Sequence, residues 1–356
     1  MVEDRKRVLI FAGCNDKKLI SKVSPILDVP AVERVYLVRM DAMDFTHPKL
    51  TQYPVVPFIK KILPLRELYR VLVGIYLILT KRINLVIGIR FLMHGVYTVL
   101  LSKLLRIKYI LLFIESPSKY EGSNFFLKAI SSASAIGVRG SSSERFFIDK
   151  GIPKEKIFTP PNEFTLPKIE RLQDRKEYDL IYIGNFIEIK DLPLWIEIFK
   201  SVKKQREDIT GVMLGDGNLF ESIKSLAHRE GVYDNIDFVG RKKDVYEYIN
   251  RSKILLMTSK LEGLPMVAVE CMSVGVPAVL PDVGDVKDLI KDGENGVVIS
   301  SRNSEEYTKA ILELLSDKKR YSEMSNRAIE SIKIFSEVSS HENIVQIWTK
   351  LLEKID

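Results

Sequence analysis

The chain has 356 residues, enough for two domains of about 150–200 residues, and its 46% hydrophobic and 28% charged residues are typical of a soluble globular protein. No apolar run reaches the roughly 18 residues that a membrane span requires, and the first such run is too short for a signal peptide. The two cysteines, Cys14 and Cys271, indicate no disulfide framework and suit a reducing cytoplasm.

Short apolar runs rich in β-branched residues alternate with amphipathic stretches along the chain. In the first half, the runs expected to be strands are 7–13, 32–38, 83–89, 109–115 and 134–138. In the second half they are 178–184, 211–216, 236–240, 253–259, 277–282 and 296–300. After these runs the pattern becomes helical, at 304–317, 318–335 and 340–355. This alternation predicts an α/β protein with two doubly wound parallel sheets of five or six strands each.

The break between the two runs of strands falls in a segment rich in proline and charge. Pro160, Pro161 and Pro167 precede a charged stretch, so we expect a linker at 161–177 between domains 1–160 and 178–339. Two α/β domains that face each other place the carboxyl ends of their strands around a cleft, where ligands of such sheets bind.

The formal net charge of +7 is unevenly distributed. Between residues 51 and 114, ten basic residues face one acid, Glu67, which gives this segment a net charge of +9. The ten are Lys60, Lys61, Arg66, Arg70, Lys81, Arg82, Arg90, Lys103, Arg106 and Lys108. Because Tyr, Phe and Leu separate these charges, an anionic membrane surface is the partner we expect, ahead of nucleic acid or an ordinary solvated helix face. Leu72, Ile75 and Leu79 follow helical spacing, so we expect them to pack on the neighbouring sheet.

Two glutamates flank a Gly-Leu-Pro step in the segment "SKLEGLPMVAVECMSVGVPAV". Ser259–Leu264 is the loop that leaves a buried strand, and Pro265 is suited to the first position of the helix that follows. The amides of Met266 and Val267 would then form an anion site at the helix start. Glu262 precedes this start and Glu270 lies about 7–8 Å along the helix from Pro265. Carboxylates on both sides of an anion site suit a diphosphate with hydroxyl-rich groups at each end.

The pattern E-G-x-P-x-x-x-x-E at 262–270 resembles the retaining nucleotide-sugar glycosyltransferases of family 4, which have the GT-B fold with two Rossmann-like domains. The likeness continues through "PDVGDVKDLIKDGENGVVIS", "YIGNFIEIKDLPLWIEIF", "VMLGDGNL", "IDFVGRKKDV" and "GIPKEKIFTPPNEF". It covers residues 135–355 closely and the N-terminal third in outline. The GT-B fold further implies that the last helix, 340–356, packs back on the first domain.

The resemblance assigns roles to particular residues. Lys190 would contact the donor diphosphate, Glu262 the transferred sugar and Glu270 the ribose hydroxyls. Other donor-binding residues expected from it are Gly13, Asn185, Gly215, Gly217, Arg241, Gly263, Leu264, Pro265, Met266 and Val267. Gly215 and Gly217 would let the backbone approach a ligand, although an ordinary tight turn explains them equally well.

The chain departs from the family pattern at several positions. Asn185 replaces an arginine, and Arg241 or Lys242 would compensate for that lost charge. Glu115 stands where family members commonly carry a histidine, and it would bind the sugar, accept a proton or pair with nearby cations. Gly13 is the remnant of a glycine-rich loop, and Glu163 replaces a glycine. His94 lies in an apolar stretch and is expected to be a satisfied core histidine rather than a base.

The expected function is therefore transfer of a sugar, with retention, from a UDP- or GDP-sugar to a lipid-linked or glycan acceptor at the membrane. No metal and no cofactor are expected, nucleic acid is not an expected partner, and the expected location is cytoplasmic, peripheral on the inner face of the membrane. A sugar-nucleotide epimerase of the same fold and an inactive nucleotide-sugar-binding scaffold remain as alternatives.

Overall fold

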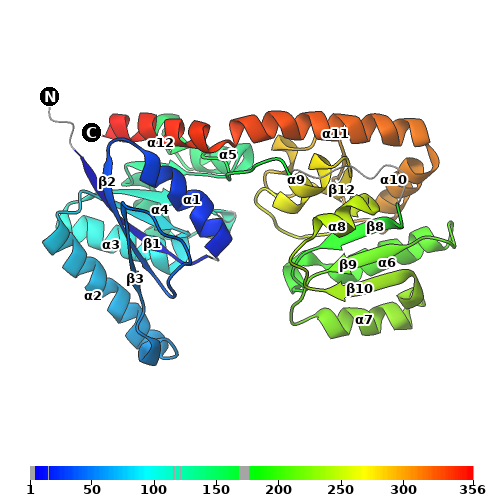
Figure 1. The fold of residues 1–356 in the computed structure, drawn as a ribbon, viewed down its shortest axis with the longest axis horizontal. Helices are drawn as coiled ribbons and strands as arrows, with labels where there is room; N and C mark the ends of the chain where they lie inside the picture. Colours follow the sequence, from blue (N-terminus) through cyan, green and yellow to red (C-terminus); the bar gives the residue numbers. More distant parts are fainter. Residues whose placement is uncertain (1–4, 15, 115–116, 121, 168–175, 356) are drawn as a thin grey trace. The chain divides into compact units, whose positions relative to one another are not determined.

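The computed structural model describes residues 5–14, 16–114, 117–120, 122–167 and 176–355. The chain forms two compact units, the first made of Met1–Thr165 and Glu337–Asp356, the second of Leu166–Ser336 (Figure 1). The linker expected at 161–177 spans the division between them, and its residues 168–175 lie outside the described part of the chain. Each unit is built on a parallel sheet of its own.

The sheet of unit 1 has seven parallel strands in the order β3-β2-β1-β4-β5-β6-β7. The strands are β1 (Lys6–Ala12), β2 (Val32–Arg39), β3 (Leu50–Pro54), β4 (Leu85–Ile89), β5 (Lys108–Leu112), β6 (Ala135–Gly137) and β7 (Ile157–Phe158). The count of five or six was too low because β3 and β7 lack a long apolar run. β3, "LTQYP", is an edge strand whose residues are all half-buried, and β7 has two residues.

Helices cover both faces of the unit 1 sheet. They are α1 (Asp16–Asp28), α2 (Leu63–Lys81), α3 (Val96–Leu105), α4 (Asn124–Ser131), α5 (Ser141–Asp149) and α12 (His341–Ile355). Alternate residues of β1 point to the two faces, so that Val8 and Ile10 pack with α1 and α12, whereas Leu9 and Phe11 pack with α2 and α3.

The last helix, α12, belongs to unit 1 although it ends the chain. Its Ile344, Trp348, Leu351 and Leu352 are buried in the same core as β1. The Trp348 ring lies edge-on to Phe158, with ring centroids 5.2 Å apart. Figure 1 shows α12 beside α1, an arrangement that fixes this end of the chain in the core of unit 1.

The sheet of unit 2 has six parallel strands in the order β10-β9-β8-β11-β12-β13. They are β8 (Tyr178–Ile183), β9 (Gly211–Leu214), β10 (Ile236–Gly240), β11 (Ser252–Leu256), β12 (Ala278–Pro281) and β13 (Val297–Ile299). The helices are α6 (Leu192–Lys203), α7 (Phe220–Arg229), α8 (Tyr246–Asn250), α9 (Met266–Ser273), α10 (Ser304–Ser316) and α11 (Lys318–Val338). Trp195 and Phe199 of α6 stack at 5.4 Å in the core of this unit.

Both sheets follow the doubly wound order, in which the strand sequence reverses beside the first strand. The reversal lies between β1 and β4 in unit 1 and between β8 and β11 in unit 2. In open α/β sheets, ligands bind outside the carboxyl ends of the strands at this switch point. The prediction of two doubly wound parallel sheets is confirmed, and the topology locates the edge of each sheet that a ligand would use.

Helix α2 corrects part of the expectation for the basic segment. Leu72 and Leu79, expected to pack on the sheet, are 54% and 67% exposed, whereas Arg70, expected to meet lipid, is only 4% exposed. The inner face of α2 carries Arg70, Gly74, Leu77 and Ile78. Gly74 allows close packing, because a Cβ atom there would lie 2.6 Å from the Phe11 ring. Among the described helices, none is both long and apolar enough to cross a membrane.

Candidate functional site

On one side of the unit 2 switch point, two loops at the carboxyl ends of the strands are in close backbone contact. The loop after β8 approaches the loop after β9, with hydrogen bonds from the Gly184 amide to the Leu214 carbonyl (3.0 Å) and from the Phe186 amide to the Asp216 carbonyl (2.9 Å). Gly215 has a φ of 138°, and a Cβ atom on it would lie 1.7 Å from the Gly184 carbonyl oxygen. A Cβ on Gly217 would lie 2.4 Å from the Phe186 oxygen. Both glycines are therefore required by the contact between these loops.

Lys190 ends a single 3-10 turn, Glu188–Lys190, at the carboxyl side of β8. The next residue, Asp191, adopts a left-handed conformation (φ 47°) that redirects the chain into α6. The Thr258 hydroxyl donates to the carbonyls of Lys190 and Asp191, both at 3.0 Å, and the Lys260 amide donates to the Ile189 carbonyl at 2.8 Å. The loop after β11 thus fixes the backbone of Lys190.

The Nζ atom of Lys190 lies 2.5 Å from Oε1 of Glu262, and both side chains are mostly buried. The backbone of Glu262 packs closely against Gly284, where a Cβ atom would lie 2.2 Å from the Glu262 carbonyl oxygen. The Asp285 amide also donates to the Gly263 carbonyl at 3.2 Å. The structure therefore brings together two residues expected to act on neighbouring parts of one ligand, and joins them directly as an ion pair.

Tyr182 belongs to the same cluster, although its strand pattern does not distinguish it from a core residue. Its hydroxyl donates to the Asn185 carbonyl at 2.9 Å. Burial, and then the nearby charge of Glu262, raise the pKa of Tyr182. Tyr182 therefore stays protonated at neutral pH and keeps its hydroxyl on the Asn185 carbonyl.

Helix α9 starts one residue later than expected, with buried Pro265 at its N-cap, and it ends at Ser273. The amides of its first turn, including those of Met266 and Val267, have no acceptor within the helix. Glu270 lies further along α9, near Tyr246 of α8. Burial, and then the charge of Glu270, raise the pKa of Tyr246 to about 12. The second glutamate thus lies beside an aromatic side chain on a separate helix.

A pocket of about 220 Å³ opens at the carboxyl ends of β8, β9 and β10. It is lined by Ile183, Gly184, Asn185, Leu214, Gly215, Arg241, Lys242 and Val245. The Lys242 ammonium lies over the Tyr248 ring, 5.8 Å from its centroid. Three expected donor-binding residues, Asn185, Gly215 and Arg241, therefore share one pocket. Since pockets that enclose a whole small molecule measure about 300–1,000 Å³, this one suits part of a larger ligand.

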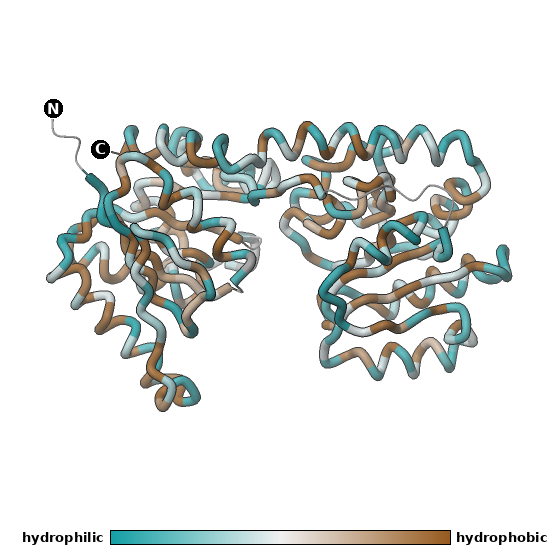
Figure 2. The backbone as a smooth tube through the Cα atoms, in the orientation of Figure 1, coloured by the Kyte–Doolittle hydropathy of each residue, from teal (hydrophilic) through white to brown (hydrophobic). Residues whose placement is uncertain are grey.

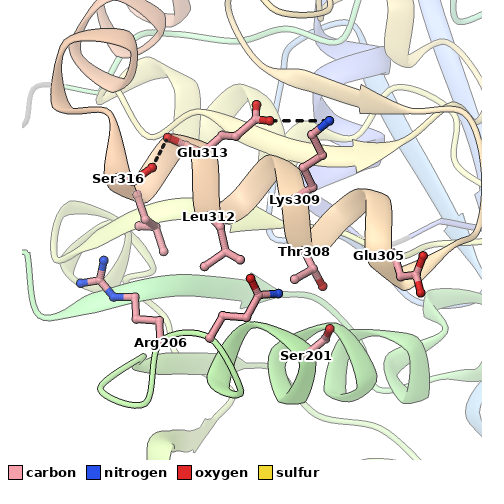
Figure 3. Close-up of a pocket in the computed structure, with 10 residues that line it drawn as sticks. Ser201, Arg206, Glu305, Thr308, Lys309, Leu312, Glu313 and Ser316 are labelled. Carbon is pink, nitrogen blue, oxygen red and sulfur yellow. Dashed lines mark hydrogen bonds and ion pairs between the residues drawn. The ribbon is translucent and has the colours of Figure 1, made fainter.

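A larger groove of about 570 Å³ lies between α6 and α10, away from these loops (Figure 3). Three of its four charged lining side chains are paired, with Glu313 contacting Lys309 at 4.0 Å and Arg320 at 2.7 Å, and Arg206 contacting Asp208 at 3.3 Å. Figure 3 shows Leu312 and Thr308 projecting from α10 toward α6, which carries Ser201. The groove offers no converging set of unpaired charges, so the switch point is the stronger candidate site.

In unit 1, Gly13 follows β1 at the other switch point and lies directly against His94. A Cβ atom on Gly13 would lie 2.1 Å from Cε1 of the imidazole. The Nε2 atom of His94 lies 3.3 Å from Nη1 of Arg70. Arg70 in turn contacts Glu67 (3.1 Å), which also accepts from the Tyr97 hydroxyl at 2.6 Å. His94 is thus buried in a polar network, and burial, followed by the charge of Arg70, lowers its pKa to about 4.

The remaining predicted residues are placed as follows. Glu115 lies outside the described part of the chain, so its role stays a prediction. Glu163 lies 3.5 Å from Nδ1 of His341. Within the residues that the structure describes, no group of three or more His, Cys, Asp or Glu side chains is arranged to hold a metal ion. Thr258 and Tyr182 are the residues that the sequence analysis missed, because nothing in their strands distinguishes them from ordinary core positions.

Comparison with known proteins finds a family profile that matches part of the chain. The sequence profile of the family described as Glycosyl transferases group 1 matches residues 166–331. An uncharacterized glycosyltransferase of Haemophilus influenzae is 26% identical over 213 residues, covering 60% of this chain and 59% of that protein. The GalNAc-alpha-(1->4)-GalNAc-alpha-(1->3)-diNAcBac-PP-undecaprenol alpha-1,4-N-acetyl-D-galactosaminyltransferase of Campylobacter jejuni is 26% identical over 223 residues, 62% of this chain and 60% of that one. The chain thus aligns with about three fifths of each relative's length.

Solved structures extend the likeness to almost the whole chain. HepE of Anabaena in complex with UDP and glucose superposes with a TM-score of 0.77 at 16% identity, covering 98% of this chain and 100% of that one. Sucrose-phosphate synthase from Thermosynechococcus elongatus gives a TM-score of 0.79 at 14% identity, covering 99% of both chains. At such low identity the likeness concerns the fold, which is GT-B.

Proposed function

We propose that the protein is a retaining glycosyltransferase, on the premise that residues 166–331, nearly all of unit 2, match the profile of the group 1 glycosyl transferases. It would move a sugar from a nucleotide-sugar donor to a lipid-linked or surface-glycan acceptor at the inner face of the membrane. The observation that carries the proposal is the Lys190–Glu262 pair at the switch point of unit 2, together with the 220 Å³ pocket at the carboxyl ends of β8, β9 and β10 in the same sheet. Lys190, Glu262 and the start of α9 thus bring a cation, a carboxylate and free helix amides to the carboxyl ends of the unit 2 strands.

The donor diphosphate is proposed to bind at Lys190 and the start of α9. A diphosphate would compete with Glu262 for the ammonium of Lys190, while the first amides of α9 donate to its oxygens. Glu262 is then free to accept a hydrogen bond from a hydroxyl of the transferred sugar. The ion pair therefore holds both side chains in place before the donor arrives.

The nucleoside end is proposed to lie between the 220 Å³ pocket and Glu270. The carboxylate of Glu270 would accept hydrogen bonds from the ribose hydroxyls. Arg241 and Asn185 line the same pocket, so Arg241 would supply near the phosphates the charge that Asn185 lacks. A UDP-sugar is the donor we favour, and the relative HepE was solved in complex with UDP and glucose.

Transfer is proposed to need no protein nucleophile. The acceptor oxygen would form a bond to the anomeric carbon on the face from which the diphosphate leaves, as the bond from that carbon to the phosphate oxygen breaks. The acceptor proton would pass to the departing phosphate oxygen. Lys190 stabilises the negative charge that develops there, and a preorganised charge at a developing anion typically contributes roughly a hundredfold or more in rate.

The acceptor is proposed to be attached to the membrane. The name of the Campylobacter relative contains a saccharide joined to PP-undecaprenol. A lipid extract incubated with labelled UDP- and GDP-sugars should therefore give a glycosylated lipid, at a rate about a hundredfold lower for Lys190→Ala. Nucleoside diphosphate binding without transfer would indicate a scaffold, and an altered free sugar nucleotide would indicate an epimerase. Failure to bind any nucleotide would contradict the proposal.

Calorimetry of nucleoside diphosphate binding tests the two glutamates separately. Glu270→Gln should weaken UDP binding by about 1.5–3 kcal/mol, because it removes a charged acceptor for the ribose. Glu262→Gln should leave UDP affinity unchanged or raise it, because Lys190 is released for the diphosphate, while it impairs transfer. Equal losses of UDP affinity in both variants would show that the assigned division of roles is wrong.

A further inference from the structure

Helix α2 carries an apolar stripe on the side opposite its buried face. Its five members are 45–67% exposed, and they are Leu65, Leu68, Leu72, Tyr76 and Leu79. At 100° per residue these positions fall within an arc of about 80°. Gly74 and Leu77 lie on the opposite side, so packing of α2 against the sheet fixes the stripe outward. An ordinary surface helix shows one apolar face, whereas α2 shows two.

Further exposed apolar residues lie just before α2 in the sequence and on the neighbouring helix α3. Phe58 and Ile62, just before the helix, are exposed, and so are Leu100 and Leu104 on α3. Helix α3 packs beside α2 within unit 1. Figure 2 shows hydrophobic residues recurring along α2 and at the turn that precedes it. Exposed apolar side chains are therefore concentrated on two neighbouring helices and the turn before α2, and monomeric proteins keep such surfaces small unless they bind something.

Cations border the stripe. Lys61 lies just before α2 and Arg82 just after it, and both are exposed, as are Lys103 and Arg106 at the end of α3. Glu67, the single acid of the 51–114 segment, is engaged by Arg66, Arg70 and the Tyr97 hydroxyl. The segment that carries the stripe is therefore both apolar and positive, and its one carboxylate is already paired.

We propose that the α2 stripe inserts into the interface of an anionic lipid bilayer, with the bordering cations on the lipid phosphates. A narrow apolar arc with Lys and Arg beside it is the pattern of helices that lie in the plane of the membrane surface. Each cation near an anionic surface contributes up to about 1 kcal/mol. A second copy of this chain is the poorer occupant, because symmetric pairing of two stripes would bring two segments of net charge +9 together. The inference rests on the proposed function for the membrane-bound acceptor, but its test involves no sugar transfer.

An introduced tryptophan reports insertion directly. The two natural tryptophans, Trp195 and Trp348, are buried, so a tryptophan at an exposed position dominates any change on lipid binding. Leu72→Trp should shift its emission to shorter wavelength with vesicles of phosphatidylglycerol and be quenched by brominated acyl chains. Ile334→Trp, on the exposed side of α11, is the matched control and should do neither. An unchanged emission of Leu72→Trp, or an equal shift in both variants, overturns the proposal.

Sedimentation with vesicles separates the two components of binding. Binding of the wild type should rise with the phosphatidylglycerol fraction and fall at high salt, because the lipid charge and its screening control the cationic part. Leu68→Gln with Leu72→Gln and Leu79→Gln should reduce binding at least tenfold, whereas Ile334→Gln with Val338→Gln should not. Lys61→Gln with Arg82→Gln should reduce the dependence on anionic lipid.

Three outcomes contradict the inference. They are no binding to vesicles, binding that the triple leucine variant retains, and a wild-type dimer that this variant converts to a monomer. All variants should bind UDP as the wild type does, since the stripe belongs to unit 1 and the proposed donor site to unit 2. Loss of vesicle binding in the triple leucine variant, with UDP binding intact, would support the membrane surface. Failure of the wild type to bind UDP would contradict the proposed function and leave the vesicle result unaffected.

Discussion

His94 is kept neutral inside unit 1, and this makes the stability of that unit depend on pH. Burial, and then Arg70, lower its pKa to about 4 in the folded chain, against about 6.5 for an unfolded chain. Between these values the unfolded state binds more protons, so stability present above pH 6.5 is lost as the pH falls toward 4. The loss is on the order of 3 kcal/mol. Hydrogen exchange, corrected for its intrinsic pH dependence, should show lower protection of the β1 and β4 amides at pH 5 than at pH 7.5.

His341 requires a control in that experiment because it acts in the opposite direction. Burial lowers the pKa of His341, but its contacts with Asp28 and Glu163 raise it more, so the net pKa is raised. Its contribution is fully present below pH 6.5 and is lost as the pH rises through the raised value. His94→Gln should abolish the loss at low pH, and a loss that persists in this variant would assign the effect to another group.

The sequence predicted which residues lie near the unit 2 switch point better than it predicted their contacts, and their roles in binding stay predictions. Lys190, Glu262 and Glu270 were selected from local motifs, and the fold brings Lys190 and Glu262 together at 2.5 Å. Their direct pairing was not predictable, because it depends on loops 72 residues apart. Thr258 was missed for the same reason, since its partner Lys190 is 68 residues away in the sequence. Tyr182 was missed although its partner Asn185 is close by, because it lies in a strand pattern that looks like ordinary core.

At the level of elements, the contact between the loops after β8 and β9 depends on Gly215. Gly215→Ala would place a Cβ atom 1.7 Å from the Gly184 oxygen at a φ of 138°, so we expect unit 2 to lose about 3 kcal/mol or more. Gly293→Ala is the matched control, because its φ is 75° but nothing lies within 4 Å, and it should cost only about 1–2 kcal/mol. Urea unfolding checks both. Equal costs would mean that backbone conformation, and not the loop contact, explains the glycine.

Helix α2 shows why periodicity alone did not orient an element. Its apolar residues occupy both sides, so the spacing of Leu72, Ile75 and Leu79 fitted a core face as well as an exposed one. Two contacts determine which side of α2 faces the sheet. Gly74 packs against Phe11, and Arg70 contacts His94. Neither contact is visible in the sequence, because a glycine and an arginine within a helix do not mark its inner face.

At the scale of the whole molecule, the alternation of strands and helices predicted two doubly wound sheets, and that architecture is confirmed. The strand counts were less accurate, because edge strands such as β3 lack the apolar runs that identify central strands. The chain begins in unit 1, passes through unit 2 and returns at Glu337. The core of unit 1 therefore contains side chains from both ends of the sequence.

Two tryptophans allow each core to be weakened separately. Trp348 of α12 is buried against Phe158 in unit 1, and Trp195 of α6 against Phe199 in unit 2. Removing either ring leaves a large cavity, so we expect Trp348→Ala and Trp195→Ala each to cost about 3–5 kcal/mol. Because the cores belong to different units, hydrogen exchange should accelerate in β1 and β4 for Trp348→Ala, and in β8 and β11 for Trp195→Ala. Equal acceleration in both sheets for either variant would show that the two units unfold as one cooperative body.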